Sequence, residues 1–232
     1  MSTTALPVSH ADDRFAPTAR TTLKRLAVRG RYDRAAVHAI LDEGLVCHVA
    51  FTMESGPAII PTAYGRIDDV LYLHGSTANR MLRALASGAQ ACITVTLIDG
   101  LVLARSAFHH SMNYRCVVIY GAGEKVTDAE EHERALAAIV EHIVPGRAPS
   151  VRPPSRDEVL RTLVVRFPIV EVSVKERMGG PVDDEEDHAL DVWAGTIPLR
   201  LVPGAPVDDP MVPPRVAPAP HATQYRRPGN CG

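Results

Sequence analysis

The fold of this chain is decided by one segment, Pro61-Thr-Ala-Tyr-Gly-Arg-Ile-Asp-Asp-Val-Leu-Tyr-Leu-His-Gly-Ser-Thr-Ala-Asn-Arg80. Two apolar, strand-like halves flank a polar turn at Asp68–Asp69, which predicts a β-hairpin. The second half breaks at His74, and small residues then lead into a helix expected over Thr77–Ser87. Arg80 falls in the first turn of that helix. Free backbone N–H groups, hydroxyls and a guanidinium at a helix start suit a phosphate monoester.

Short strand-like runs continue on both sides of this segment. Leu45–Phe51 and Ala58–Tyr64 predict a hairpin, and Asp99–Gly100 predicts another turn. Capping boxes that begin at Thr127 and at Ser155 predict two of the few helices. Closely spaced strands with few helices between them favour an antiparallel barrel over a parallel βαβ sheet.

The composition is that of a soluble globular protein. The 232 residues are 46% hydrophobic and 22% charged, and the formal net charge is −2. A protein that binds nucleic acid would show a strongly basic face, so we expect no nucleic-acid partner. No apolar run approaches the roughly 20 residues that span a bilayer, so we expect no membrane contact. The four cysteines form no Cys-x-x-Cys pair and no signal peptide is visible, which favours the cytoplasm.

Proline marks the boundary of the folded domain. Fifteen of the 19 prolines lie at or beyond Pro145, and they are densest after Pro203. Because proline cannot donate to helix or strand ladders, we expect an extended tail that contributes little to the core. The sequence therefore divides into an N-terminal arm over 1–30, a barrel domain over 31–202 and a Pro-rich C-terminal tail over 203–232.

The quoted segment resembles the flavin-nucleotide site of the pyridoxamine 5'-phosphate oxidase-like family, FMN-binding split β-barrels, in its nitroimidazole-resistance-like branch. The resemblance covers roughly residues 31–201. It implies a mainly β protein with α-helices (α+β), folded as an antiparallel split β-barrel. It also implies a homodimer with the cofactor site at the subunit interface.

The resemblance further implies which residues contact FMN. In the family, a basic residue early in the helix holds the flavin phosphate, and Arg80 is the matching position. Where the biosynthetic oxidases have an Arg-Lys pair, this chain has Asn79-Arg80. One protomer would contribute the turn and the strand over Ala58–Tyr64, while its partner would contribute residues of the run after Arg105. The lone tryptophan, Trp193, could cap the ring face of the flavin or equally plug the barrel. The expected cofactor-binding residues are Pro61, Thr62, Ala63, Tyr64, Leu73, His74, Gly75, Ser76, Asn79, Arg80, Ser111, Asn113, Tyr114, Arg115 and Trp193.

Other interpretations of these residues stay open. The helix around Arg80 could be an ordinary capped helix with an exposed arginine. Adjacent histidines such as His109–His110 rarely bind one ion together and no carboxylate or thiolate stands at ligand spacing, so we expect no metal site. The acidic run over 181–187 is typical of a solvated loop.

Three functions are compatible with the sequence. The first is an FMN-dependent oxidoreductase acting on a small molecule, in which the flavin performs the redox step and no catalytic side chain is identified. The second is a haem-binding or haem-handling protein on the same fold, with His74 as the axial ligand. The third is a non-catalytic flavin-binding protein.

Overall fold

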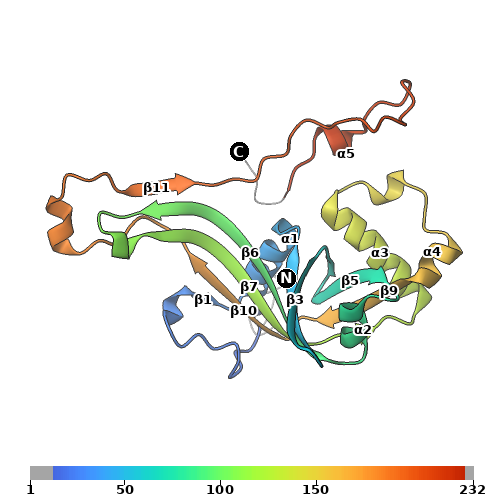
Figure 1. The fold of residues 1–232 in the computed structure, drawn as a ribbon, viewed down its shortest axis with the longest axis horizontal. Helices are drawn as coiled ribbons and strands as arrows, with labels where there is room; N and C mark the ends of the chain where they lie inside the picture. The colour runs from blue at the N-terminus through green and yellow to red at the C-terminus, as the bar shows by residue number, and fades with distance from the viewer. Residues whose placement is uncertain (1–12, 228–232) are drawn as a thin grey trace, which may run out of the picture.

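The computed structural model describes residues 13–227, so the first 12 residues of the arm and the last five of the tail, with Cys231, lie outside the described residues. It is an α+β fold with two antiparallel sheets (Figure 1). The larger sheet contains Gly30–Arg31 (β1), Cys47–Met53 (β2), Gly56–Thr62 (β3), Gln90–Leu103 (β6), Ser111–Ala122 (β7), Glu171–Arg177 (β10) and Gly195–Pro198 (β11). The smaller sheet contains Gly65–Ile67 (β4), Val70–Ser76 (β5), Glu124–Lys125 (β8) and Thr162–Pro168 (β9).

The strand order places β3 at one edge of the larger sheet. Its order is β1-β10-β7-β6-β2-β3, with β11 beside the outer part of β6, and the smaller sheet has the order β4-β5-β9-β8. In Figure 1, β6 and β7 form a long curved ribbon that extends well beyond the rest of the body. The helices are Arg34–Glu43 (α1), Arg80–Ala86 (α2), Ala129–Ile143 (α3), Arg156–Arg161 (α4) and Pro220–Thr223 (α5). Within 13–227, no helix is long and apolar enough to cross a membrane.

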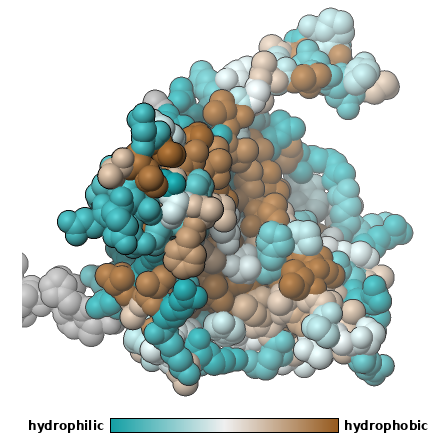
Figure 2. Space-filling model, turned by 60° about the vertical axis from the view of Figure 1, so that its left-hand side comes forward, coloured by the Kyte–Doolittle hydropathy of each residue, from teal (hydrophilic) through white to brown (hydrophobic). Residues whose placement is uncertain are grey.

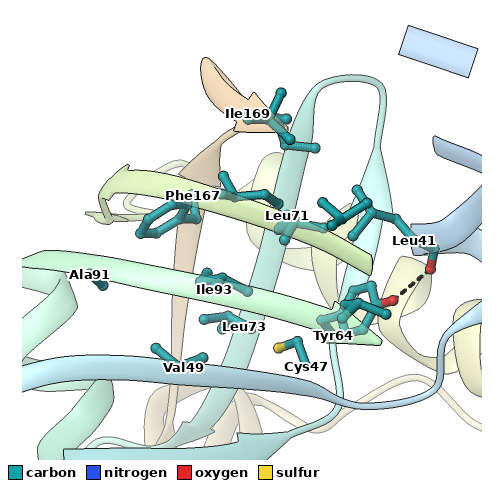
Figure 3. Close-up of a cluster of buried hydrophobic side chains, with 14 of the residues drawn as sticks. Leu41, Cys47, Val49, Tyr64, Leu71, Leu73, Ala91, Ile93, Phe167 and Ile169 are labelled. Atoms are coloured by element: carbon teal, nitrogen blue, oxygen red, sulfur yellow. Dashed lines mark hydrogen bonds between the residues drawn. The ribbon is translucent and has the colours of Figure 1, made fainter. Parts of the chain in front are cut away.

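The core lies between the two sheets. Side chains on a strand alternate between faces, and β2 follows this rule with Cys47, Val49 and Phe51 buried. They pack with Leu71 and Leu73 of β5, so the two sheets share one core (Figure 3). The side chains that fill it are among the most fully buried of the described residues.

The predicted hairpin at Asp68–Asp69 is confirmed. Ile67 pairs with Val70 across it, and Asp68 has a φ of 49°, in the left-handed region that Asp tolerates in turns. The predicted strand break at His74 is wrong, because β5 continues to Ser76. The helix begins at Arg80, three residues later than predicted, because the side chain of Asn79 caps it.

The predicted turn at Asp99–Gly100 is wrong. β6 runs through these residues with an irregularity in its register, and the chain reverses only at residues 104–110. The guanidinium of Arg115 on the neighbouring strand binds both carboxylate oxygens of Asp99, at 2.9 and 2.6 Å. Asp99 is thus held by a cross-strand ion pair and is not free to form a local turn.

The N-terminal arm, from residue 13 on, lies against the body. Phe15 is buried, and the guanidinium of Arg34 stands 4.3 Å from the centre of its ring. Arg20 of the arm pairs with Glu171 at the start of β10. These contacts connect the arm to α1 and to the larger sheet.

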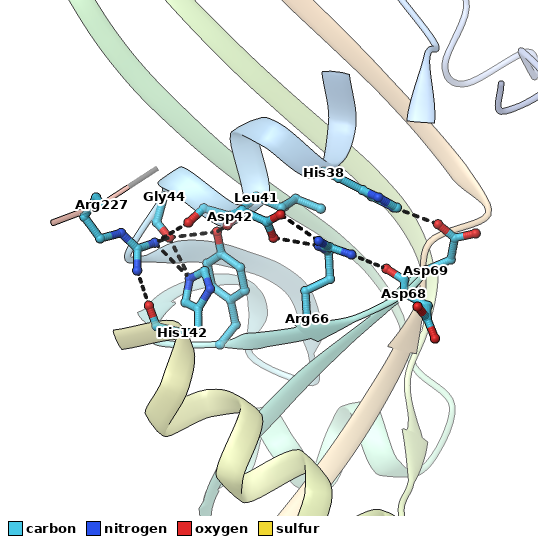
Figure 4. A network of polar contacts seen from close by, with 10 residues as sticks. His38, Leu41, Asp42, Gly44, Arg66, Asp68, Asp69, His142 and Arg227 are labelled. Atoms are coloured by element: carbon cyan, nitrogen blue, oxygen red, sulfur yellow. Dashed lines mark hydrogen bonds and ion pairs between the residues drawn. The ribbon is translucent and has the colours of Figure 1, made fainter. Parts of the chain in front are cut away.

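The C-terminal tail is extended, as predicted, but its end contributes to the core. Arg227 is 6% exposed and donates to the main-chain oxygens of Asp42, Glu43 and Gly44, at 2.6, 3.2 and 2.8 Å (Figure 4). It also donates to the main-chain oxygen of His142. The expectation that the tail adds little to the core is therefore wrong at Arg227.

We predict that Arg227→Ala lowers the free energy of unfolding by about 1–3 kcal/mol, because it leaves buried carbonyls without donors. Urea unfolding followed by circular dichroism would measure this loss. Arg226→Ala is the matched control, since Arg226 is exposed. Equal stability of the two variants would contradict a structural role for the buried guanidinium.

Candidate functional site

The turn between β5 and α2 is held by its own hydrogen bonds. The N–H of Ala78 donates to Oγ of Ser76 at 3.2 Å, and the N–H of Asn79 donates to the main-chain oxygen of Ser76 at 2.8 Å. The N–H of Thr77 donates to the oxygen of Arg161 at 3.1 Å. The predicted free backbone donors are therefore largely in use, and the turn offers a ligand mainly its side chains.

Arg80 is the available cation at this turn. It is the first residue of α2, it is exposed, and its guanidinium forms no hydrogen bond or ion pair with any residue of 13–227. Arg83, one turn later, is exposed and unpaired in the same way. The two differ in position, because Arg80 directly follows the cap residue Asn79 whereas Arg83 lies one turn further along α2.

His74 lies on the face of β5 that is turned toward α3. His74 stands two residues after Tyr72, so the two side chains lie on the same face of β5, and Tyr72 packs with α3. His74 pairs with Val164 of β9. Its Nδ1 is buried without a hydrogen-bond partner among the described residues. Burial lowers the pKa of His74, so the ring is neutral at pH 7 and one nitrogen lone pair is available.

Strand β3 has an exposed main-chain edge. Pro61 and Thr62 lie on β3 at the edge of the larger sheet, where a proline costs no ladder hydrogen bond. The side chain of Tyr64 is fully buried, and its hydroxyl donates to the oxygen of Leu41 at 2.6 Å. Leu73 is also fully buried. Tyr64 and Leu73 can therefore meet a cofactor only through the main chain.

A second group of candidate residues lies on β7, and two of its polar side chains, Asn113 and Arg115, already have partners. Asn113 accepts from the guanidinium of Arg177 at 2.6 Å and donates to the oxygen of Gly179. Arg115 pairs with Glu43 as well as with Asp99. Hydrogen bonds to Asp99 and to Glu43 raise the pKa of Arg115, so its charge is permanent but already neutralised.

Trp193 lies just before β11, which pairs with β6, and it is exposed. Its side chain is 66% exposed and lies over Gly195, where a Cβ atom would come within 2.8 Å of the indole. In Figure 1, β11 and α2 lie at opposite ends of the molecule. Within one chain, the structure therefore gathers the residues from Leu73 to Arg80 around the turn into α2, and the group at the start of β7 and Trp193 lie away from it.

The adjacent histidines and the acidic run over 181–187 lie at the tip of the ribbon of β6 and β7. No group of three or more candidate metal ligands occurs within residues 13–227. His109 pairs with Asp184 at 3.1 Å. The N–H and the guanidinium of Arg105 each donate to Asp183 at 2.8 Å, so the acidic run fastens the tip of the ribbon and is not merely solvated.

Sequence reasoning missed a groove of about 510 Å³ that begins at Thr77. Its walls come from the start of α3, from α4, from β9 and from Pro153–Pro154. No local motif joins these four segments, and only the fold brings them together. The capping box at Ser155 is confirmed, whereas the N-cap of α3 is Asp128 and not Thr127.

Comparisons with known proteins identify relatives of this chain. The family model for pyridoxamine 5'-phosphate oxidase matches residues 33–176. No curated protein matches the sequence. The flavocytochrome Anf3 of Azotobacter vinelandii is 39% identical, with a TM-score of 0.86, over 91% of this chain and 99% of that one. An FAD- and haem-binding protein of Mycobacterium smegmatis is 35% identical, with a TM-score of 0.80, over 83% and 95%. A candidate 5-nitroimidazole antibiotic resistance protein of Bacteroides thetaiotaomicron is 25% identical, with a TM-score of 0.54, over 63% and 85%.

Proposed function

Since the chain belongs to the pyridoxamine 5'-phosphate oxidase family, we propose that it is a flavin-dependent oxidoreductase acting on a small molecule. The bound group would be the FMN moiety, either free or as part of FAD. Its phosphate would lie at the turn from Ser76 to Arg80. When bound, the isoalloxazine ring supplies the electron transfer, and the protein supplies binding and orientation.

One observation carries this proposal: the unpaired guanidinium of Arg80. Arginine side chains at buried or half-buried positions, such as Arg66, Arg115 and Arg227, donate to carboxylate or main-chain acceptors. Arg80 has none, although the turn beside it is fixed by hydrogen bonds and by the Asn79 cap. A fixed turn with a free cation fits a phosphate dianion. The flavin-binding relatives, at 39% and 35% identity, support the same cofactor class.

We predict that Arg80→Ala weakens FMN binding by about ten- to a hundredfold, because a charge-assisted hydrogen bond to the phosphate is lost. Riboflavin, which lacks the phosphate, should bind to the variant and to the unchanged protein alike. Titration of apoprotein by flavin fluorescence measures both ligands.

Arg83→Ala is the matched control, because Arg83 is also exposed and unpaired on α2. Equal loss of FMN in both variants, or equal loss of FMN and riboflavin in Arg80→Ala, would rule out Arg80 as the phosphate ligand. Steady-state turnover with NADH or NADPH and a panel of quinones and nitro compounds tests the redox activity. Flat rates with every pair would favour a non-catalytic flavin-binding protein.

A second function, haem binding, is favoured by His74. A neutral imidazole with an unused nitrogen is the form that ligates haem iron. Burial keeps His74 neutral, and its Nδ1 has no partner. Two relatives with more than a third of their residues identical are a flavocytochrome and an FAD- and haem-binding protein. We therefore propose His74 as the axial ligand of a non-covalently bound haem.

We predict that the purified protein shows a Soret band and that His74→Ala abolishes it while flavin content stays unchanged. The absorbance spectrum records both cofactors in one measurement. His132→Ala is a suitable control, because His132 lies on the neighbouring helix α3 and its ring nitrogen already contacts the oxygen of Thr162. A Soret band that survives in His74→Ala would exclude His74 as the ligand.

We also propose a cytoplasmic homodimer with the cofactor between the subunits. The ribbon of β6 and β7 and the start of the tail carry exposed apolar side chains, which gather on one face in Figure 2. Large exposed apolar patches mark interaction sites. A partner subunit would bring the second group of candidate residues to the Arg80 turn of the first. The exposed apolar residues are Ile98, Leu101, Phe108, Met112, Trp193, Ile197, Leu199, Leu201 and Val202.

We predict that Phe108→Asp yields a monomer that has lost its flavin. Phe108 is 89% exposed, so the substitution does not disturb packing within one chain. Analytical ultracentrifugation gives the mass and absorbance gives the flavin content. Val207→Asp, at 93% exposure on the tail, controls for an added surface charge. A monomer that retains full flavin occupancy would contradict a shared site.

A further inference from the structure

The N-terminal arm carries a concentration of positive charge that the fold leaves partly uncompensated. Residues 20–31 contain five lysine or arginine side chains and no aspartate or glutamate, whereas the whole chain has a formal net charge of −2. Two of the five pair with glutamates of β10. The other three form no ion pair with any residue of 13–227, and they are Lys24, Arg25 and Arg29. These three cations remain available to attract a negatively charged partner.

Two aliphatic side chains project from the same turn. Leu26 is 44% exposed and Val28 is 92% exposed, although both are apolar. Leu26 has a φ of 56°, in the left-handed region that leucine rarely adopts, and a single 3₁₀ turn, Ala27–Arg29, follows it. An apolar centre with a charged rim is the arrangement of many protein–protein interfaces. These two aliphatic residues and the three free cations are called the basic patch below.

The basic patch adjoins the strands that carry the second group of candidate site residues. Gly30, directly after the patch, pairs with Lys175 of β10, a further cation that has no ion pair within 13–227. Burial and the charge of Arg29 lower the pKa of Arg177 at the end of β10, so the two guanidinium groups lie close together. Arg177 in turn donates to Asn113 at 2.6 Å. A single side chain, that of Arg177, therefore links the patch to a residue proposed to contact the flavin.

From these observations we infer that the basic patch is a docking site for an acidic electron-carrier protein, which delivers electrons to the bound flavin. The inference rests on the proposed flavin-dependent redox function. Opposite charges on the two proteins raise the association rate and fix their orientation, which suits a short-lived electron-transfer complex.

Other macromolecules fit the basic patch less well. Residues 20–31 contain no aromatic side chain on which a nucleic-acid base could stack. A membrane surface is bound by an amphipathic helix with a broad apolar face, whereas this part of the arm forms one three-residue turn. An acidic protein needs only the exposed cations and the small apolar centre that the turn presents.

Two small acidic electron carriers, a flavodoxin and a [2Fe–2S] ferredoxin, serve as probes of the full chain. Calorimetry measures their binding, and stopped-flow absorbance measures reduction of the bound flavin. The triple variant Lys24→Glu, Arg25→Glu and Arg29→Glu should bind the carriers and be reduced by them at least about tenfold less well at low salt. Salt at about 0.5 M should remove most of this difference. Reduction by dithionite, which needs no docking, should stay unchanged.

The matched control reverses three exposed cations elsewhere, so that both variants have the same net charge: Arg134→Glu, Arg156→Glu and Arg215→Glu. This control should bind the carriers as the unchanged protein does. Equal loss in both variants, or binding of neither carrier by the unchanged protein, would overturn the docking site.

The remaining outcomes identify a different occupant or separate the two proposals. Loss of the dimer in the patch variant alone, seen by analytical ultracentrifugation, would overturn the inference, because the patch would then contact a second copy of the chain. Binding to phosphatidylglycerol vesicles that only the patch variant loses would overturn it in favour of a membrane surface. A carrier that binds at the patch without reducing the flavin would contradict the electron delivery and the redox function, and only the acidic docking site would stand.

Discussion

The C-terminal end of α1 is the point on which the arrangement of the domain depends. A helix leaves its last carbonyls without intrahelical donors, and a buried carbonyl must find one elsewhere. Three distant segments supply them: the hydroxyl of Tyr64 after β3, the ring of His142 at the end of α3, and the guanidinium of Arg227 from the tail (Figure 4). Burial and the nearby Arg227 lower the pKa of His142 to about 4, so an uncharged ring lies beside the cation. Only a glycine fits at position 44 in this junction, since a Cβ atom there would come within 2.4 Å of Val95.

This junction fixes the place where the two sheets separate. Tyr64 joins β3 of the larger sheet to β4 of the smaller one, so anchoring its hydroxyl positions both sheets relative to α1. Helix α3 approaches the next residue closely, because a Cβ atom on Gly65 would lie 2.7 Å from the main chain of Ile139. After β4, the C-terminal end of β5 carries His74 and Ser76 to the turn before α2. The candidate site therefore lies on elements whose positions are set by main-chain contacts rather than by its own side chains.

Local patterns in the sequence predicted the parts of the fold that depend on neighbouring residues. The alternation in β2, the turn at Asp68–Asp69 and the capping box at Ser155 are short-range features, and each is confirmed. The turn at Asp99–Gly100 was wrong because a long-range ion pair with Arg115 outweighs local turn preference. Arg227 could not be predicted, because its partners are main-chain oxygens about 85 and 185 residues away that carry no side-chain signal. The family resemblance identified the candidate site, but not the contacts that already occupy Asn113 and Arg115.

The contacts that Asn113 and Arg115 already make within the chain limit what a partner subunit can contribute to the proposed site. Arg115 is neutralised by Asp99 and Glu43, so it brings no net positive charge to a phosphate on another chain. Asn113 is bonded to Arg177, and breaking that contact would leave a buried guanidinium with fewer acceptors. In the proposed dimer, the charge that holds the phosphate would therefore come from Arg80 of the chain that provides the turn. The partner would contribute mainly apolar and aromatic surface, with the exposed indole of Trp193 as its largest flat group.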